Sequence, residues 1–273
     1  MGESNNKRLA VGGLGAIGLA VARAVDAGKV PGFELVAVSA RDQDKAKATL
    51  AGFRKAPALT SLAGLADAAD VIVEGLPSAL FAEIAEPALA KGRTFMPLSV
   101  GALLKHMHLV DLAKKSGGRI VVPTGALLGL DAVRATAEGK IESVRMITRK
   151  PPAGLKGAPL LVEKNISVDN LKEPLRIFEG SAREAILGFP ANVNVAVALS
   201  LAGIGPDATR IEIWADPAVT RNTHTIKVVS DSSDLTMTIE NIPSLENPRT
   251  GKITALSVLA ALRRMTSPLV VGS

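Results

Sequence analysis

A glycine-rich turn near the start of the chain constrains the fold more than any other feature of the sequence. The segment Gly13–Gly18 has the pattern G-x-G-x-x-G, follows the apolar run Leu9–Gly12 and opens the helical pattern Ala16–Ala27. Glycine-rich turns also occur as plain connections, but this strand, turn and helix context favours binding of a dinucleotide pyrophosphate at the helix N-terminus. The predicted dinucleotide-contacting residues of the turn are Gly13, Gly15, Ala16, Ile17 and Gly18.

The first 124 residues alternate short apolar runs with helical patterns, as a parallel sheet with crossover helices requires. Glycine or proline marks most of the junctions. We therefore predict a Rossmann-type, doubly wound α/β domain over residues 1–124. The expected strands are Leu9–Gly12, Leu35–Val38, Val71–Glu74, Thr94–Leu98 and Arg119–Val122, and the expected helices are Ala16–Ala27, Gln43–Leu50, Ala79–Lys91 and Leu103–Lys115.

The pattern changes after Thr124, because the later candidate strands alternate apolar and polar residues, as in a sheet with one covered face. We predict a second, α+β domain over residues 125–245. The last helix has an apolar stripe, so residues 246–273 are expected to return to the first domain. The expected strands are Ile141–Arg149, Thr209–Ala215, Thr223–Asp231 and Leu235–Ile242, and the expected helices are Ala191–Ala202 and Ile253–Arg264.

Composition excludes several kinds of chemistry. The chain has no cysteine and no tyrosine, so disulfides, thiolate catalysis, iron–sulfur clusters and cysteine zinc sites are ruled out. Its net charge is +6, but basic residues occur singly or in pairs and aromatic residues make up 3%, which argues against nucleic acid. No stretch approaches the roughly 20 apolar residues of a membrane span, and the N-terminal segment lacks the apolar region of a signal peptide. We expect a cytoplasmic protein with neither a membrane nor a nucleic-acid partner.

The end of the expected second strand bears on which dinucleotide is bound. NAD enzymes place an acid there to bind both ribose hydroxyls, whereas this segment holds Ser39 and Arg41. A hydroxyl and a guanidinium suit a 2′-phosphate, and Arg41 can also stack on adenine. In the alternative interpretation Arg41 is a solvated loop charge and Asp42 caps the next helix. We predict a preference for NADP, with NAD tolerated.

Four side chains are candidates for proton chemistry. Glu74 ends an expected strand and is either a buried acid or a carboxylate hydrogen-bonded to backbone. His106 and His108 lie in a helical pattern that points them about 200° apart, so we interpret them as solvated helix residues rather than joint ligands. His224 starts a strand after a polar turn, and imidazole is well matched to proton transfer near neutrality. Spacing alone leaves a catalytic role and an ordinary strand histidine equally open.

Several later motifs are more specific than the glycine turn. They are Pro123–Ala126, Gly129–Ala132, Phe189–Ala196, Asp216–His224, Glu240–Pro243 and Asn247–Thr250. Together with the glycine turn they extend over nearly the whole chain, which resembles the L-aspartate dehydrogenase family. The chain departs from the family pattern at Thr124, where serine is expected before the glycine.

The resemblance implies a two-domain enzyme, often dimeric, that oxidises L-aspartate with NAD or NADP and supplies iminoaspartate for NAD biosynthesis. Iminoaspartate and water give oxaloacetate and ammonia, and the reaction is reversible. By analogy His224 is the catalytic histidine, and Ala126 and Asn192 contact the cofactor, with Asn194 as the alternate for Asn192. An N-cap role for Asn192 is compatible with this. The alternatives are a dehydrogenase for another amino acid or imine, and a non-catalytic NAD(P)-binding regulatory module.

A dicarboxylate substrate needs cations or N–H donors to bind it. Arg221 and Lys227 flank His224 in the sequence, but strand alternation places Lys227 on the opposite face from His224. Neither is favoured as a ligand, and the sequence leaves the carboxylate-binding residues open.

Overall fold

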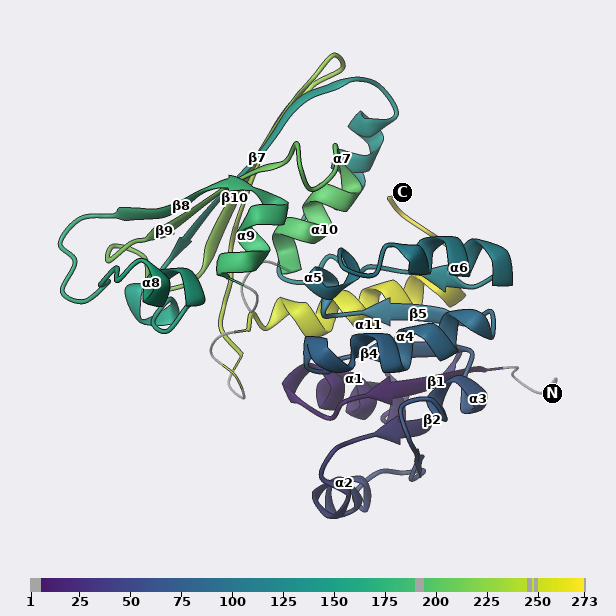
Figure 1. Cartoon of the computed structure of the whole chain (residues 1–273). Coiled ribbons are helices and arrows are strands. Elements are labelled where there is room, and N and C mark those ends of the chain that lie inside the picture. Colours follow the sequence, from purple (N-terminus) through teal and green to yellow (C-terminus); the bar gives the residue numbers. More distant parts are fainter. Residues whose placement is uncertain (1–5, 190–193, 245–246, 248–249, 273) are drawn as a thin grey trace. The chain divides into compact units, whose positions relative to one another are not determined.

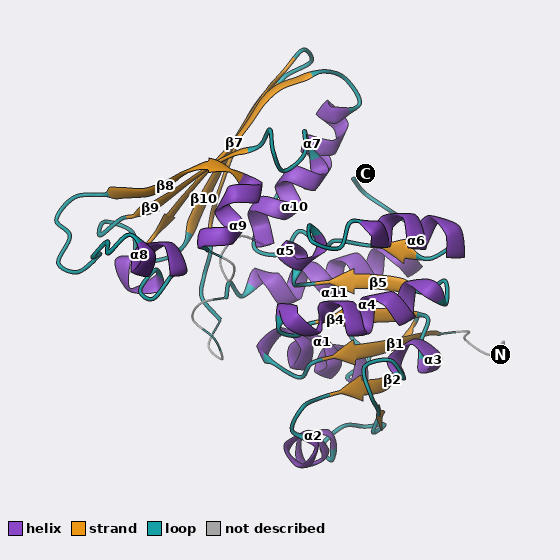
Figure 2. Cartoon of the chain, in the orientation of Figure 1, coloured by secondary structure: helices purple, strands orange, loops and turns teal. Residues whose placement is uncertain are grey.

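The chain forms two compact units, each with its own sheet (Figures 1 and 2). The computed structural model describes residues 6–189, 194–244, 247 and 250–272. The first unit comprises Met1–Pro123 with Ala255–Val270, and the second comprises Thr124–Thr254 with Val271–Ser273.

The first unit contains a parallel sheet in the order β3-β2-β1-β4-β5-β6. This is the strand order of a Rossmann fold, so the predicted doubly wound architecture is confirmed. Its strands are β1 (Lys7–Gly12), β2 (Phe33–Ser39), β3 (Ala58–Leu59), β4 (Val71–Glu74), β5 (Thr94–Pro97) and β6 (Arg119–Ile120). Its helices are α1 (Ala16–Asp26), α2 (Gln43–Leu50), α3 (Leu65–Ala68), η1 (Ser78–Leu80), α4 (Phe81–Ala90), α5 (Val100–Leu103), α6 (His108–Ser116) and α11 (Ile253–Thr266).

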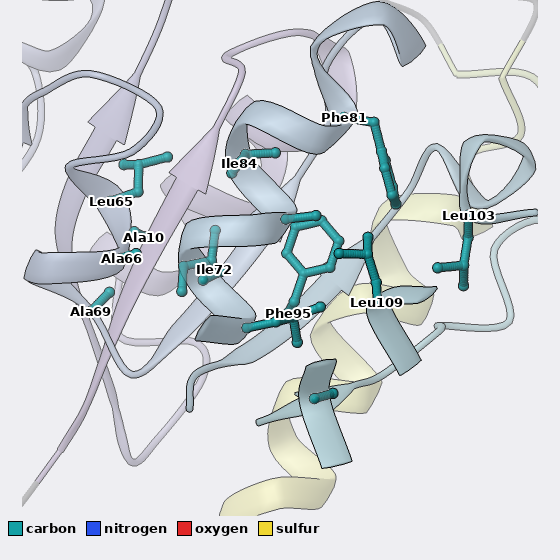
Figure 3. Packing of buried hydrophobic residues seen from close by; sticks show 14 of the residues in the cluster. Ala10, Leu65, Ala66, Ala69, Ile72, Phe81, Ile84, Phe95, Leu103 and Leu109 are labelled. Atoms are coloured by element: carbon teal, nitrogen blue, oxygen red, sulfur yellow. The ribbon is translucent and has the colours of Figure 1, made fainter. Parts of the chain in front are cut away.

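A hydrophobic cluster lies on each face of this sheet, because successive side chains of a strand point to opposite faces. On β1, Ala10 joins the cluster that packs beneath α3, α4 and α6, whereas Leu9 and Val11 join the cluster beneath α1 and α11. Phe81 and Phe95 meet edge to face in the first cluster, with ring centroids 5.5 Å apart (Figure 3). Helices on both faces are what a central parallel sheet of buried strands requires.

The C-terminal helix α11 completes the second of these clusters. Val258 and Leu262 are fully buried there. The Arg263 guanidinium donates to the Lys29 carbonyl at 2.6 Å, and the Thr266 hydroxyl donates to the Pro31 carbonyl at 3.0 Å. The predicted return of the C-terminal helix to the first domain is therefore confirmed.

The second unit contains a mixed sheet in the order β11-β10-β7-β9-β8, in which only the β7–β9 pair is parallel among the described strands. Helices α7, α9 and α10 lie along one face of it (Figure 1), which confirms the predicted α+β class. The strands are β7 (Ile141–Lys150), β8 (Leu175–Ser181), β9 (Arg210–Ala215), β10 (Thr223–Ser230) and β11 (Asp234–Glu240). The helices are α7 (Leu130–Ala137), η2 (Pro152–Gly154), α8 (Pro159–Glu163), α9 (Ala182–Gly188) and α10 (Asn194–Ala202).

The structure corrects one predicted helix and adds elements that were not predicted. The expected helix Leu103–Lys115 is broken, because α5 ends at Leu103 and α6 begins at His108. Leu103 and Leu109 are both buried, whereas an unbroken helix would place residues six apart on different faces. The expected helix overlaps α5 only at Leu103. The elements not predicted are β3, β8, α3, α7, η2, α8 and α9. The expected helix Ala191–Ala202 is described from Asn194, and residues 191–193 lie outside the described residues.

Candidate functional site

The glycine turn of the first unit has the geometry of a pyrophosphate cradle. Gly13 has a φ of +95°, and a Cβ added there would lie 2.5 Å from the Gly75 carbonyl oxygen. A Cβ on Gly18 would lie 2.0 Å from the Gly13 carbonyl oxygen, so this glycine allows α1 to approach the turn closely. A Cβ on Gly15 would meet nothing within 4 Å. The turn therefore leaves open space at Gly15, where a diphosphate can approach the backbone.

The first turn of α1 offers hydrogen-bond donors to that space. Gly15 is the N-cap residue, and no side chain of the described structure caps α1 through a hydrogen bond. Ala16 and Ile17 are half-buried residues of this first turn. Because the first N–H groups of a helix lack intrahelical partners and carry the positive end of the dipole, they suit a diphosphate. The residues present thus fit the pyrophosphate of a dinucleotide.

The end of β2 is joined to the glycine turn. The Gly13 N–H donates to the Ser39 carbonyl at 2.8 Å, and the Ser39 side chain is buried. Arg41 is exposed in the loop that follows. The Asp42 carboxylate accepts from the Lys45 N–H at 3.0 Å and caps α2. The carboxylate nearest the end of β2 is therefore engaged as a helix cap.

Glu74 organises the loops that follow β4 and β5. Its fully buried carboxylate accepts from the backbone N–H groups of Leu76 at 2.6 Å, Leu98 at 3.2 Å and Ser99 at 3.0 Å. The Ser99 hydroxyl donates to it at 3.0 Å. Burial raises the pKa of Glu74, and these donors oppose the rise. Glu74 is therefore both a buried acid and a carboxylate hydrogen-bonded to backbone, so each interpretation describes part of what the structure shows.

His224 of the second unit is a buried, neutral imidazole. It lies opposite Thr148 in the β10–β7 register, and its Nδ1 is 3.0 Å from the Thr148 hydroxyl oxygen. Only 3% of its surface is exposed. Burial, and then the charge of Lys150, lower the pKa of His224 to about 3. The ring is therefore held in place through Nδ1 and is uncharged near neutral pH.

Lys150 lies on the same strand face as Thr148, two residues further along β7. Its side chain is buried, and burial lowers its pKa to about 8. Sequence reasoning missed both residues. The alternation of β7 could have indicated them, because Val144 and Met146 are followed on the same buried face by the polar residues Thr148 and Lys150.

Ala126 is connected to two of the motifs that carry the family resemblance. Its carbonyl accepts from the Asn241 Nδ2 at 3.1 Å, and the Asn241 N–H donates to the Asn222 carbonyl at 2.8 Å. Asn222 belongs to the turn before His224, so these contacts tie Ala126 to the start of β10. Asn241 Oδ1 is buried and has no hydrogen-bond partner among the described residues. Such a buried acceptor is normally satisfied by water or a ligand.

The two cations that flank His224 in the sequence lie away from its ring. The Arg221 guanidinium pairs with the Glu240 carboxylate at 2.5 Å. Lys227 is exposed, on the opposite face of β10 from His224, as alternation predicts.

Comparisons with known proteins agree with this arrangement. Residues 131–265 match the family described as "Aspartate dehydrogenase, C-terminal", and residues 13–123 match "Homoserine dehydrogenase, NAD binding domain". The chain is 56% identical over 270 residues to the L-aspartate dehydrogenase of Bradyrhizobium diazoefficiens, covering 99% of this chain and 95% of that protein. The chain belongs to the L-aspartate dehydrogenase family.

Two further members of the family extend the comparison. L-aspartate dehydrogenase 3 of Bordetella bronchiseptica is 56% identical over 265 residues, covering 97% of each chain. The crystal structure of aspartate dehydrogenase from Thermotoga maritima is 23% identical, has a TM-score of 0.74 and covers 98% of this chain and 100% of its own. At that identity the likeness shows a shared fold, and the NAD-binding domain match supports NAD(P) as the cofactor.

The structure describes three of the four remaining predicted residues. Asn194 is the first residue of α10, whereas Asn192 lies outside the described residues. His106 lies in the break between α5 and α6 and stacks on Phe81 at 5.6 Å, so its interpretation as a solvated helix residue is wrong. His108 is exposed in α6, with its Nε2 3.7 Å from the Glu86 carboxylate.

The described residues contain no group of three or more histidine, aspartate or glutamate side chains placed to hold a metal ion. In the same part of the chain, every helix is too short or too polar to cross a membrane.

Proposed function

We propose that the chain catalyses the reversible oxidative deamination of L-aspartate with NAD(P). The product is iminoaspartate, which water converts to oxaloacetate and ammonia. The observation that carries the proposal is 56% identity, over nearly the full length of both chains, to curated L-aspartate dehydrogenases. The glycine cradle and the buried histidine provide the two kinds of group that such a reaction needs.

The first unit binds the cofactor, which when bound accepts the hydride that leaves the substrate Cα. The N–H groups at Gly15, Ala16 and Ile17 hold the diphosphate, and Gly13 and Gly18 shape the turn around it. In the second unit Ala126, and Asn192 or Asn194, are proposed to contact the cofactor. This part of the proposal follows the family resemblance.

His224 is proposed to move the proton of the hydrolytic step. Thr148 engages Nδ1, so Nε2 is the atom we assign to the reacting water. The neutral imidazole takes a proton as water attacks the imine carbon, and returns it to the departing hydroxyl in the reverse direction. A pKa of about 3 makes His224 a weak base in the free protein. A bound dicarboxylate raises that pKa, because negative charge favours the imidazolium.

A panel of amino acids, assayed by reduced-nicotinamide absorbance, tests this function. We expect turnover with L-aspartate to exceed that with L-glutamate, L-alanine and L-asparagine. Faster turnover of another amino acid would assign the chain to a different substrate. Cofactor binding by fluorescence, without turnover of any amino acid, would instead identify an NAD(P)-binding regulatory module.

We further propose that NADP is preferred and NAD is tolerated. Ser39 and the exposed Arg41 suit a 2′-phosphate, and Asp42 is engaged as the cap of α2. Dissociation constants for both reduced cofactors, in wild type and Arg41→Ala, test the preference. The substitution should weaken NADPH binding and leave NADH binding nearly unchanged. Equal affinities for both cofactors in the two proteins would contradict it.

The enzyme is also proposed to be a cytoplasmic homodimer that supplies iminoaspartate for NAD biosynthesis. In the second unit, the sheet face opposite α7, α9 and α10 carries Trp214, with the guanidinium carbons of Arg149 and Arg176 at 5.0 and 5.7 Å from its ring centre. Such a face suits a second copy of the chain, and light scattering with a Trp214→Ala variant tests this arrangement. A wild-type protein that is monomeric at micromolar concentration would refute the dimer.

A further inference from the structure

One polar cluster interrupts the buried face of the second unit's sheet. Along the middle of β7 and β10 this face is apolar, with Val144, Met146, Ile226 and Val228 buried. Toward the C-terminal end of β7 and the N-terminal end of β10, its side chains are instead Thr148, Lys150 and His224, each at most 4% exposed. Polar side chains buried this deeply cost free energy, so a function is the natural reason to place them there.

The charge of this cluster matches what the proposed substrate requires. L-aspartate presents two carboxylates, and carboxylates in proteins bind to ammonium, guanidinium or N–H donors. Arg221 pairs with Glu240, and Lys227 lies on the opposite face of β10. Among the described residues of β7 and β10, Lys150 is the cation that shares a face with His224.

We propose that the Lys150 ammonium binds a carboxylate of the substrate next to His224. This inference rests on the proposed function, because it takes the L-aspartate reaction as given and assigns the group that positions the substrate. Because Lys150 and His224 lie on the same buried face, an ionic contact at Lys150 brings a dicarboxylate to the face that carries the imidazole. Lys150 is thus a substrate-binding residue, and His224 remains the group that moves the proton.

The surroundings of Lys150 hold the strand end in place. The Asp216 N–H donates to the Lys150 carbonyl at 2.8 Å, and the Asp216 carboxylate pairs with the Arg149 guanidinium at 2.8 Å. These contacts hold the backbone at Arg149 and Lys150, so the Lys150 side chain extends from a fixed point of the strand.

Electrostatics support the same assignment. The positive charge of Lys150 is one cause of the lowered pKa of His224, so the two groups interact electrostatically. The pKa of Lys150, about 8, leaves the ammonium mostly charged at pH 7 despite its burial. A carboxylate bound beside Lys150 and His224 would raise both pKa values, because negative charge favours the protonated forms.

The test compares Lys150→Met with the matched control Lys227→Met, which removes the same charge from the opposite face. We expect Lys150→Met to raise the KM for L-aspartate and the inhibition constant of succinate by about 10- to 150-fold. Its kcat, and its dissociation constant for NADPH, should stay within a few-fold of wild type. Lys227→Met should change none of these values by more than about twofold.

Three outcomes would overturn the inference. Values of KM and of the succinate constant within twofold of wild type would show that Lys150 does not bind the substrate. A fall in kcat at constant KM would assign Lys150 to proton transfer instead. Equal losses in both variants would point to a general effect of net charge.

A second variant and a binding measurement keep the test valid if Lys150→Met folds poorly. Lys150→Arg retains the charge, so its dissociation constant for succinate should stay within about tenfold of the wild-type value. The dissociation constant of Lys150→Gln should rise by more than that. Succinate binding by calorimetry does not depend on turnover. If wild type fails to oxidise L-aspartate, the proposed function is wrong, and unchanged succinate binding in Lys150→Gln separately refutes the role of Lys150.

Discussion

In the first unit the candidate site is made by backbone, whereas in the second unit it is made by side chains. The proposed cofactor cradle depends on Gly13, Gly15 and Gly18, which contribute by lacking a Cβ. The cluster of Thr148, Lys150 and His224 depends on polar groups carried into a buried face. The three glycines of the first arrangement bring no charged group with them. The second keeps an imidazole and an ammonium away from water, on the buried face of a sheet.

Removal of the imidazole should have the largest effect on turnover. His224→Ala is expected to lower kcat for L-aspartate by about 10²- to 10⁴-fold, the usual contribution of a general acid–base group. The dissociation constant for NADPH should stay close to the wild-type value, because His224 is not among the residues proposed to contact the cofactor. His108→Ala, at an exposed position of α6, is the control. Unchanged turnover in His224→Ala would remove the catalytic role.

Two glycine substitutions separate binding from folding in the cradle. Gly15→Ala adds a methyl group to open space and should weaken NADPH binding by about tenfold or more, without lowering the melting temperature. Gly18→Ala forces a Cβ against the Gly13 carbonyl and should also destabilise the protein, by about 1–3 kcal/mol. Urea unfolding and fluorescence titration measure the two effects. A stable Gly18→Ala with normal affinity would show that the close contact is easily relaxed.

The buried Glu74 carboxylate accepts hydrogen bonds from backbone N–H groups of the loops after β4 and β5. Glu74→Gln replaces an oxygen acceptor by an N–H₂ donor that faces N–H groups. We expect a loss of about 1–3 kcal/mol in the free energy of unfolding, together with weaker NADPH binding. Glu83→Gln, at an exposed position of α4, should change neither quantity. Equal stability of the two variants would mean that water satisfies the donors.

The pH dependence of stability should report the cost of burying His224. Its folded pKa of about 3 lies below the ordinary 6.5, so the unfolded chain binds more protons between these values. The contribution of His224 to stability is therefore full above pH 6.5 and falls as the pH drops toward 3, by up to about 1.4 kcal/mol per pH unit. Urea unfolding at pH 7 and pH 5 should show a smaller difference in His224→Asn than in wild type. An identical difference would place the histidine in contact with water.

The same contrast explains which parts of the molecule the sequence predicted. The determinants of the cradle lie within Gly13–Gly18 and its flanking strand and helix, so a local pattern was enough. The contact of Thr148 with His224 joins residues 76 positions apart through the β7–β10 register, which no local pattern encodes. His224 was identified through the family resemblance, whereas Lys150 lay one residue beyond the predicted end of its strand. Similarly, the break before His108 depends on tertiary packing of Leu103 and Leu109.

The return of α11 to the first unit has a consequence for how the chain is made. Strands β1 to β6 leave the ribosome within the first 123 residues, yet the helix that buries Val258 and Leu262 on their second face comes more than 130 residues later. During synthesis that face of the nascent sheet has no α11 to cover it while the whole second unit is translated. The cofactor unit can therefore be completed only after the second unit has been translated.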